Sequence, residues 1–107
     1  MAQAVLLVET RPVSTERAEE FNEWYDTVHI PEIIAKVPGF IGARRYLTSP
    51  ASPTQPEQPY LAIYEIEADD PDAVLREMQR AVAERELAQT TSLSRDPAPT
   101  ITLYVSI

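Results

Sequence analysis

The side chains best suited to chemistry in this sequence lie between positions 22 and 29, around the only histidine of the chain. Asn22, Asp26 and His29 follow one another at spacings of four and three residues, which places them on one face of a helix. On that face the Asp26 carboxylate would accept a hydrogen bond from one imidazole N–H of His29 and make the other nitrogen a better base. The alternative is a structural histidine that caps a helix or lies on the surface.

A His–Asp pair beside tyrosines and an arginine suits proton transfer next to a carbonyl group. His29 would abstract or return the proton, and a tyrosine or arginine would stabilise the enolate oxygen. Tyr25 adjoins the pair, although it also belongs to an apolar stripe where its hydroxyl needs only a backbone partner. Isomerisation, cyclisation and dehydration are the reactions that this arrangement favours.

Other kinds of site have less support in the sequence. A mononuclear zinc or iron site normally needs two or three His or Cys ligands, and the chain has one His and no Cys. Haem requires one axial histidine, but His29 beside Asp26 is explained equally well without it. The chain shows no dinucleotide fingerprint, and its two glycines exclude a glycine-rich phosphate loop. We therefore expect no metal and no cofactor.

Composition limits the partners. The net charge of −8 argues against nucleic acid, which is bound through Lys and Arg. No apolar run reaches the roughly 20 residues that a membrane-spanning helix needs, and the N-terminus does not resemble a signal peptide. Absence of cysteine fits a reducing compartment. We expect a cytoplasmic protein with a small-molecule ligand.

The elements that position these residues follow from periodicity and from breaker residues. Alternating or β-branched apolar runs predict strands at 4–9, 40–48, 60–66 and 101–107. Apolar steps of three and four predict a helix from Ser14 or Thr15 to about His29, where Pro31 ends it and starts a short turn. A second helix, capped by Asp70, extends to about Ala88.

The order βαββαβ predicts one α+β, ferredoxin-like domain over residues 1–107, with a four-stranded antiparallel sheet and two helices on one face. The open face would also be apolar, because the first and third strands carry apolar residues on both sides. A second subunit would cover it, which predicts a homodimer; the alternative is a monomer with an amphipathic open face. Four prolines make residues 49–59 an exposed loop.

The segment Phe-Asn-x-Trp-Tyr-Asp-x-x-His-Ile-Pro-Glu at 21–32, followed by Val-Pro-Gly-Phe at 37–40 and Ala-Arg-Arg-Tyr at 43–46, resembles the EthD-like members of the dimeric α/β-barrel superfamily. The resemblance covers residues 20–46 most strongly. It implies a homodimer in which each subunit keeps its own cleft between sheet and helices. Related members include cofactor-independent polyketide cyclases, muconolactone-type isomerases, quinol-forming monooxygenases, haem-dependent enzymes and stress-response proteins.

Residue by residue, the resemblance places His29 at the cleft with Tyr25 and Asp26 just before it, and Arg45 and Tyr46 after the Pro-Gly-Phe turn. Arg44 and Arg45 must point to opposite sides of their strand, and we expect Arg45 to face the cleft. The remaining candidates for substrate binding are Trp24, Asn22, Tyr64 and Tyr104. The three aromatic residues among them also have a packing interpretation.

These observations predict an EthD-like enzyme that performs cofactor-independent acid–base chemistry beside a carbonyl of a hydrophobic, aromatic or polyketide-like substrate. The alternative is a non-catalytic ligand-binding, stress or accessory protein of a catabolic or biosynthetic pathway. A haem- or oxygen-using monooxygenase is a third, weaker alternative.

Overall fold

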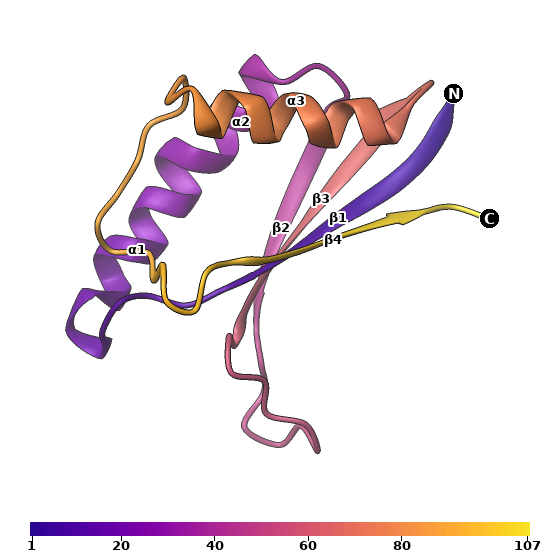
Figure 1. Ribbon diagram of the computed structural model, residues 1–107. Coiled ribbons are helices and arrows are strands. Elements are labelled where there is room, and N and C mark those ends of the chain that lie inside the picture. Colours follow the sequence, from indigo (N-terminus) through magenta and orange to yellow (C-terminus); the bar gives the residue numbers. More distant parts are fainter.

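Four strands form one antiparallel sheet in the computed structural model, which describes residues 1–107 (Figure 1). They are β1 (Ala2–Thr10), β2 (Phe40–Leu47), β3 (Tyr60–Ala68) and β4 (Thr100–Val105), in the order β2-β3-β1-β4 across the sheet. All four predicted strands are therefore present. With the helices on one face, this is the ferredoxin-like α+β arrangement expected from the sequence.

The first helical region is longer than predicted. A short 3₁₀ turn at Thr15–Arg17, preceded by Ser14 without a side-chain capping bond, leads into α1 (Ala18–Trp24). A π-helical turn, η2 (Tyr25–His29), then joins α1 directly to α2 (Ile30–Lys36). The prediction that the helix ends near His29 is wrong, because the backbone stays helical through Ile30 at φ −62° and ψ −50°.

The π turn explains how the helix continues past Pro31. Proline has no N–H to donate, and in a regular α-helix its ring clashes with the carbonyl four residues earlier. In η2 the Ile30 N–H instead donates to the Tyr25 carbonyl five residues back, so the helix widens immediately before the proline. Pro31, which has no N–H to donate, thus comes directly after the point where the backbone hydrogen bonds change from a four-residue to a five-residue spacing.

The second helix, α3 (Pro71–Ala83), begins as predicted and ends five residues early. The Asp70 side chain caps it by accepting from the Ala73 N–H at 3.3 Å. Glu84 leaves the helical region, and Arg85 adopts a left-handed φ of 57°, so the chain turns away before Ala88. A non-helical segment, residues 84–99, then crosses to β4.

The core lies between the sheet and the helical layer. From the helices, Phe21, Tyr25 and Ile33 are almost fully buried. They pack against the side of the sheet that presents Leu6 and Tyr64, which are opposite each other in the β1–β3 register. The predicted alternation of β3 is confirmed, since Ala62, Tyr64 and Ile66 all face this core.

The opposite side of the sheet carries no helix (Figure 1). The register brings Leu7 beside Ile63, with Val5 and Leu61 on the neighbouring positions of the same face. This apolar centre, which we call the open face, is bordered by more exposed side chains: Ile41, Arg44, Tyr46 and Tyr104.

The proline-rich loop between β2 and β3 projects beyond the sheet, as predicted for an exposed loop (Figure 1). Both the N–H and the hydroxyl of Thr48 donate to the Pro59 carbonyl, at 2.9 and 3.0 Å, and close the base of the loop. No helix of the chain combines the length and apolar character needed to cross a membrane.

Candidate functional site

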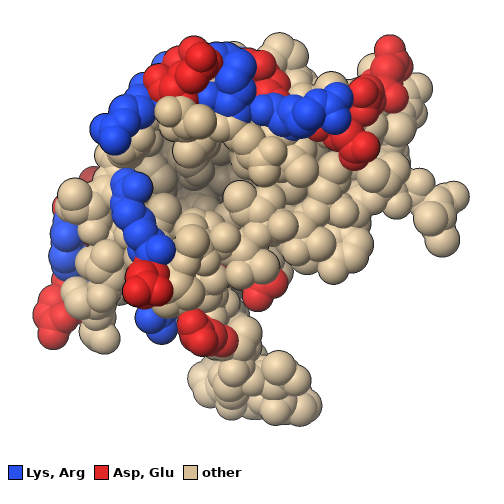
Figure 2. All heavy atoms as spheres, viewed as in Figure 1, with Lys and Arg blue, Asp and Glu red and all other residues tan.

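Two adjoining cavities form a cleft between the sheet, the helices and the 84–99 segment. The inner cavity, of about 150 Å³, is almost entirely apolar and is lined by core residues that include Tyr25, Ile33 and Tyr64. The outer cavity, of about 200 Å³, is lined by Trp24 and by residues of the 84–99 segment. Figure 2 shows the cleft as a hollow beneath α3, with mostly uncharged walls and charged side chains around its border.

His29 lies where the two cavities meet, since it lines both. Its ring stacks on Trp24 at a centroid distance of 4.5 Å and meets the Tyr25 ring edge-on at 5.1 Å. Burial lowers the pKa of His29 from 6.5 to about 4, although the negative charge of Glu32 opposes this shift. The imidazole is therefore neutral at neutral pH and acts as an acceptor and donor, not as a cation.

The predicted His29–Asp26 pair does not form. The Asp26 side chain is 61% exposed and binds Arg45 at 3.1 Å, whereas Nδ1 of His29 is buried without a hydrogen-bond partner. The π turn causes the difference, because the helix is wider over these residues and Asp26 and His29 no longer share a face.

Arg45 lies on the helix-facing side of β2, the side expected for it, but it does not line the cleft. Its guanidinium donates to Asn22 Oδ1 at 2.8 Å and to Asp26 Oδ1 at 3.1 Å, and it sits 4.5 Å from the centre of the Tyr25 ring. These contacts tie α1 to the edge strand β2. Arg44 points instead to the open face and is exposed.

The tyrosines divide between the two faces of the sheet. Tyr25 and Tyr64 line the inner cavity. Burial raises the pKa of Tyr25, an effect that the nearby hydroxyls of Tyr64 and Thr10 and the charge of Arg45 reduce. Burial also raises the pKa of Tyr64. Both phenols therefore stay protonated. Tyr46 and Tyr104, 49% and 55% exposed, lie on the open face, away from the cleft.

The structure thus brings together four of the predicted site residues, namely Trp24, Tyr25, His29 and Tyr64, and separates from them the other five: Asn22, Asp26, Arg45, Tyr46 and Tyr104.

Three buried polar atoms in this group have no hydrogen-bond partner within the chain. They are Nε1 of Trp24, Nδ1 of His29 and the hydroxyl oxygen of Tyr64, and each belongs to a residue that lines the cleft. Buried polar groups are nearly always satisfied, so unpaired ones concentrated in one place call for an explanation. Each of the three atoms is itself closed to solvent, so a polar group of a bound small molecule would pair with it only after the side chains around it move.

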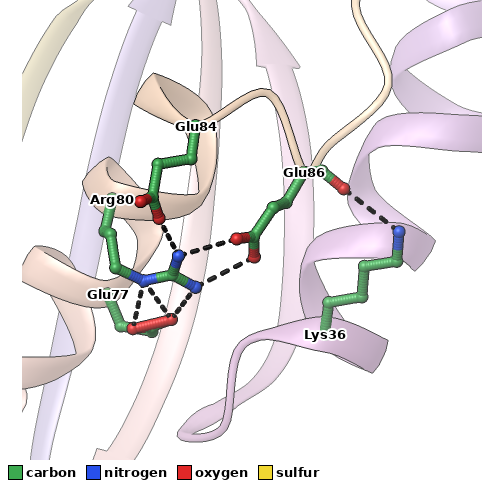
Figure 3. Close-up of polar contacts among 5 residues, drawn as sticks. All are labelled: Lys36, Glu77, Arg80, Glu84 and Glu86. Atoms are coloured by element: carbon green, nitrogen blue, oxygen red, sulfur yellow. Dashed lines mark hydrogen bonds and ion pairs between the residues drawn. The ribbon is translucent and has the colours of Figure 1, made fainter.

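The wall formed by the 84–99 segment is held to the helices by polar contacts on its outer side. Figure 3 shows Arg80 of α3 between Glu77, Glu84 and Glu86, with bonds of 2.7 and 2.9 Å to Glu86. In the same view the Lys36 ammonium of α2 donates to the Glu86 carbonyl at 3.2 Å.

Two further contacts continue this attachment along the segment. The Glu32 carboxylate accepts from the Ala88 N–H at 2.6 Å, and Arg17 donates to the Thr91 hydroxyl at 2.8 Å. The wall is therefore fixed at several points, and the cleft has a defined shape.

Sequence reasoning missed the contribution of the 84–99 segment. Leu93, Arg95 and Pro99 all line the cleft, as does Ile101 at the start of β4. Val82 of α3, which is 48% exposed, also lines the cleft. A polar, proline-containing stretch without periodicity gave no signal of which side chains turn inward.

The residues present do not form a recognisable metal site, since no group of three or more His, Cys, Asp or Glu side chains comes together. In comparisons with known proteins, no family model, no curated protein and no solved structure matches this chain.

Proposed function

We propose that this protein binds a small, largely apolar carbonyl compound in the cleft and that His29 moves a proton beside the carbonyl group. The resulting reaction would be an isomerisation, cyclisation or dehydration of the EthD-like type. One observation carries the proposal: the neutral imidazole of His29 lines both cavities at their junction, and its ring makes no hydrogen bond within the chain.

Each group of the cleft has a role in this chemistry. The neutral His29 accepts the proton from the carbon beside the carbonyl and returns it at the next position. The Tyr64 hydroxyl, protonated and next to that of Tyr25, would donate to the carbonyl oxygen as negative charge develops there. Apolar walls exclude water from the intermediate. Asp26, which binds Arg45, has no part in the proton transfer.

The second candidate is a non-catalytic ligand-binding or accessory protein. The lowered pKa of His29 favours it, because an imidazole with a pKa of about 4 is a weak base. The inner cavity also contains no charged side chain that could stabilise an enolate. In this alternative the same cleft stores or carries the ligand, and His29 only orients it.

Hydrogen–deuterium exchange distinguishes the two functions without knowledge of the product. Aromatic and polyketide-like carbonyl compounds would be incubated with the protein in deuterated buffer, and loss of the carbon-bound proton followed by NMR. Binding would be followed in parallel through the fluorescence of Trp24, the only tryptophan of the chain, which lines the cleft. We expect binding and accelerated exchange.

The variants separate proton transfer from binding. His29→Gln should slow exchange about a hundred-fold or more while binding persists, and Tyr64→Phe should slow it about ten-fold. Asp26→Asn, outside the cleft, is the matched control and should leave the rate unchanged. Binding without exchange would replace the enzyme by the ligand-binding protein, and absence of binding by every compound would eliminate both.

A further inference from the structure

We infer that Arg95 binds an anionic group, so that the ligand class of the cleft is a small amphipathic carboxylate with an apolar body. This inference rests on the proposed function insofar as it assigns a ligand to the same cleft. It does not depend on whether His29 is catalytic.

Arg95 is the only charged side chain that lines either cavity. It belongs to the outer cavity, together with the polar side chains of Gln89 and Thr90. The adjoining inner cavity is lined by aliphatic and aromatic residues and by His29. The cleft therefore changes from apolar inside to positively charged outside.

The charge of Arg95 is not compensated within the chain. Ion pairs account for five of the nine Lys and Arg residues, and these are Arg17, Lys36, Arg45, Arg76 and Arg80. Arg95 has no carboxylate partner even though the chain carries 17 acidic residues. Arg95 is exposed to solvent at the outer cavity, so its guanidinium is free to meet an anion there, and its planar fork matches a carboxylate.

The cavity dimensions indicate the apolar part of the ligand. An apolar cavity of about 150 Å³ is large enough for one benzene-sized ring, which matches the size of the inner cavity. In a substrate of the proposed reaction this ring would carry the reacting carbonyl group against His29 and Tyr64, and a short chain would carry a carboxylate into the outer cavity. The ligand would thus be an aryl- or cycloalkyl-substituted small acid.

A matched set of acids and amides tests this ligand class. Phenylacetate and hydrocinnamate would be compared with their primary amides, which keep the shape and remove the charge. Binding would be measured by calorimetry and by Trp24 fluorescence at low and at high salt. We expect the better acid to bind about ten-fold more tightly than its amide at low salt, a preference that salt reduces.

Two variants assign the preference to its source. Arg95→Gln should bring the acid down to the affinity of the amide and leave amide binding unchanged. Arg85→Gln makes the same charge change on the same segment outside both cavities, and it should preserve the preference. Equal binding of acid and amide, or a preference that survives in Arg95→Gln, would overturn the inference while leaving the proposed cleft intact. If none of the four compounds bound, the inference would fail, while the proposed function would still be decided by the carbonyl compounds of the exchange assay.

Discussion

The imidazole of His29 lies between two aromatic rings and not beside a carboxylate. A paired aspartate would raise the proton affinity of the ring, whereas stacking on Trp24 and contact with Tyr25 bury it. Burial disfavours the imidazolium, which is why the pKa falls to about 4. The residue type thus indicates proton chemistry, and the surroundings decide that the neutral form is the one available.

The lowered pKa of His29 predicts a pH dependence of stability. Between pH 6.5 and about 4 the unfolded chain binds a proton at this histidine and the folded chain does not, so the free energy of unfolding falls as pH decreases through this window. The contribution is at most about 3 kcal/mol. Below pH 4 both states are protonated and the contribution no longer changes.

Acidic residues titrate over part of the same range, so the measurement must be differential. Denaturant unfolding of wild type and of His29→Gln would be compared from pH 7 to pH 4. Wild type should lose stability relative to the variant as pH falls, with the difference levelling near the folded pKa. NMR titration of the ring gives the pKa directly. A value near 6.5, with parallel stability curves, would show that the imidazole is not buried in solution.

The expected place of His29 at a cleft agrees with the structure, whereas its expected partner, Asp26, does not. Tyr25 and Tyr64 face the core and line the cleft in agreement with helical and strand periodicity, and His29 lines it as the family resemblance implied. Asp26 does not, because one extra residue in a helical turn changes which side chains share a face. Arg95 could not be found, since its orientation depends on the path of a segment without periodicity.

At the level of elements, the sequence predicted what local pattern controls. Alternation in β3 and the Asp70–Pro71 start of α3 agree with the structure, whereas the burial of β4 does not alternate, because Ile101 and Val105 are exposed. Pro31 misled the prediction, because the usual rule ends a helix before a proline, whereas here the π turn absorbs it. The predicted end of α3 was too late, because no residue type near its last turn marks a stop. The helix ends at Ala83, and Arg85 then adopts a left-handed conformation.

Replacing Pro31 tests whether the proline maintains the π turn. Pro31→Ala restores a backbone N–H that can donate to the Thr27 carbonyl and removes the ring that disfavours regular α-helix. We expect the helix to return to α-helical register and His29 to rotate off Trp24. The pKa of His29 should then rise from about 4 towards 6.5, as measured by NMR titration.

A second proline provides the control for this substitution. Pro38 follows α2 and lies outside the helix, so Pro38→Ala should leave the His29 titration unchanged. A pKa near 4 in Pro31→Ala would mean that tertiary packing, not the proline, holds the π turn.

The molecule as a whole has a second apolar surface, which no part of this chain covers. Val5, Leu7, Leu61 and Ile63 lie at the centre of the open face. Charged side chains of both signs lie around this apolar centre. Arg44 lies opposite Ile63, Glu65 opposite Val5, and Glu9 opposite Leu61. None of these three charged side chains forms an ion pair within the chain. A two-fold symmetric contact would bring the same face of two copies together and allow these charges to pair.

We therefore propose a homodimer through the open face, and predict that sedimentation gives a mass of twice the 12.0 kDa chain. Leu7→Glu places a charge at the centre of the contact and should yield monomers. Arg44→Glu, which leaves the apolar centre intact, should weaken the dimer about ten-fold or more.

Val13→Glu is the control variant. It makes a similar apolar-to-acidic change at a position away from the sheet, where Val13 is 47% exposed, and should remain dimeric. Circular dichroism would verify that each variant is folded. A wild-type mass of 12.0 kDa at all concentrations would show that the protein is a monomer and that its open face is exposed to solvent. A dimer that persists in Leu7→Glu and Arg44→Glu would place the contact elsewhere on the surface.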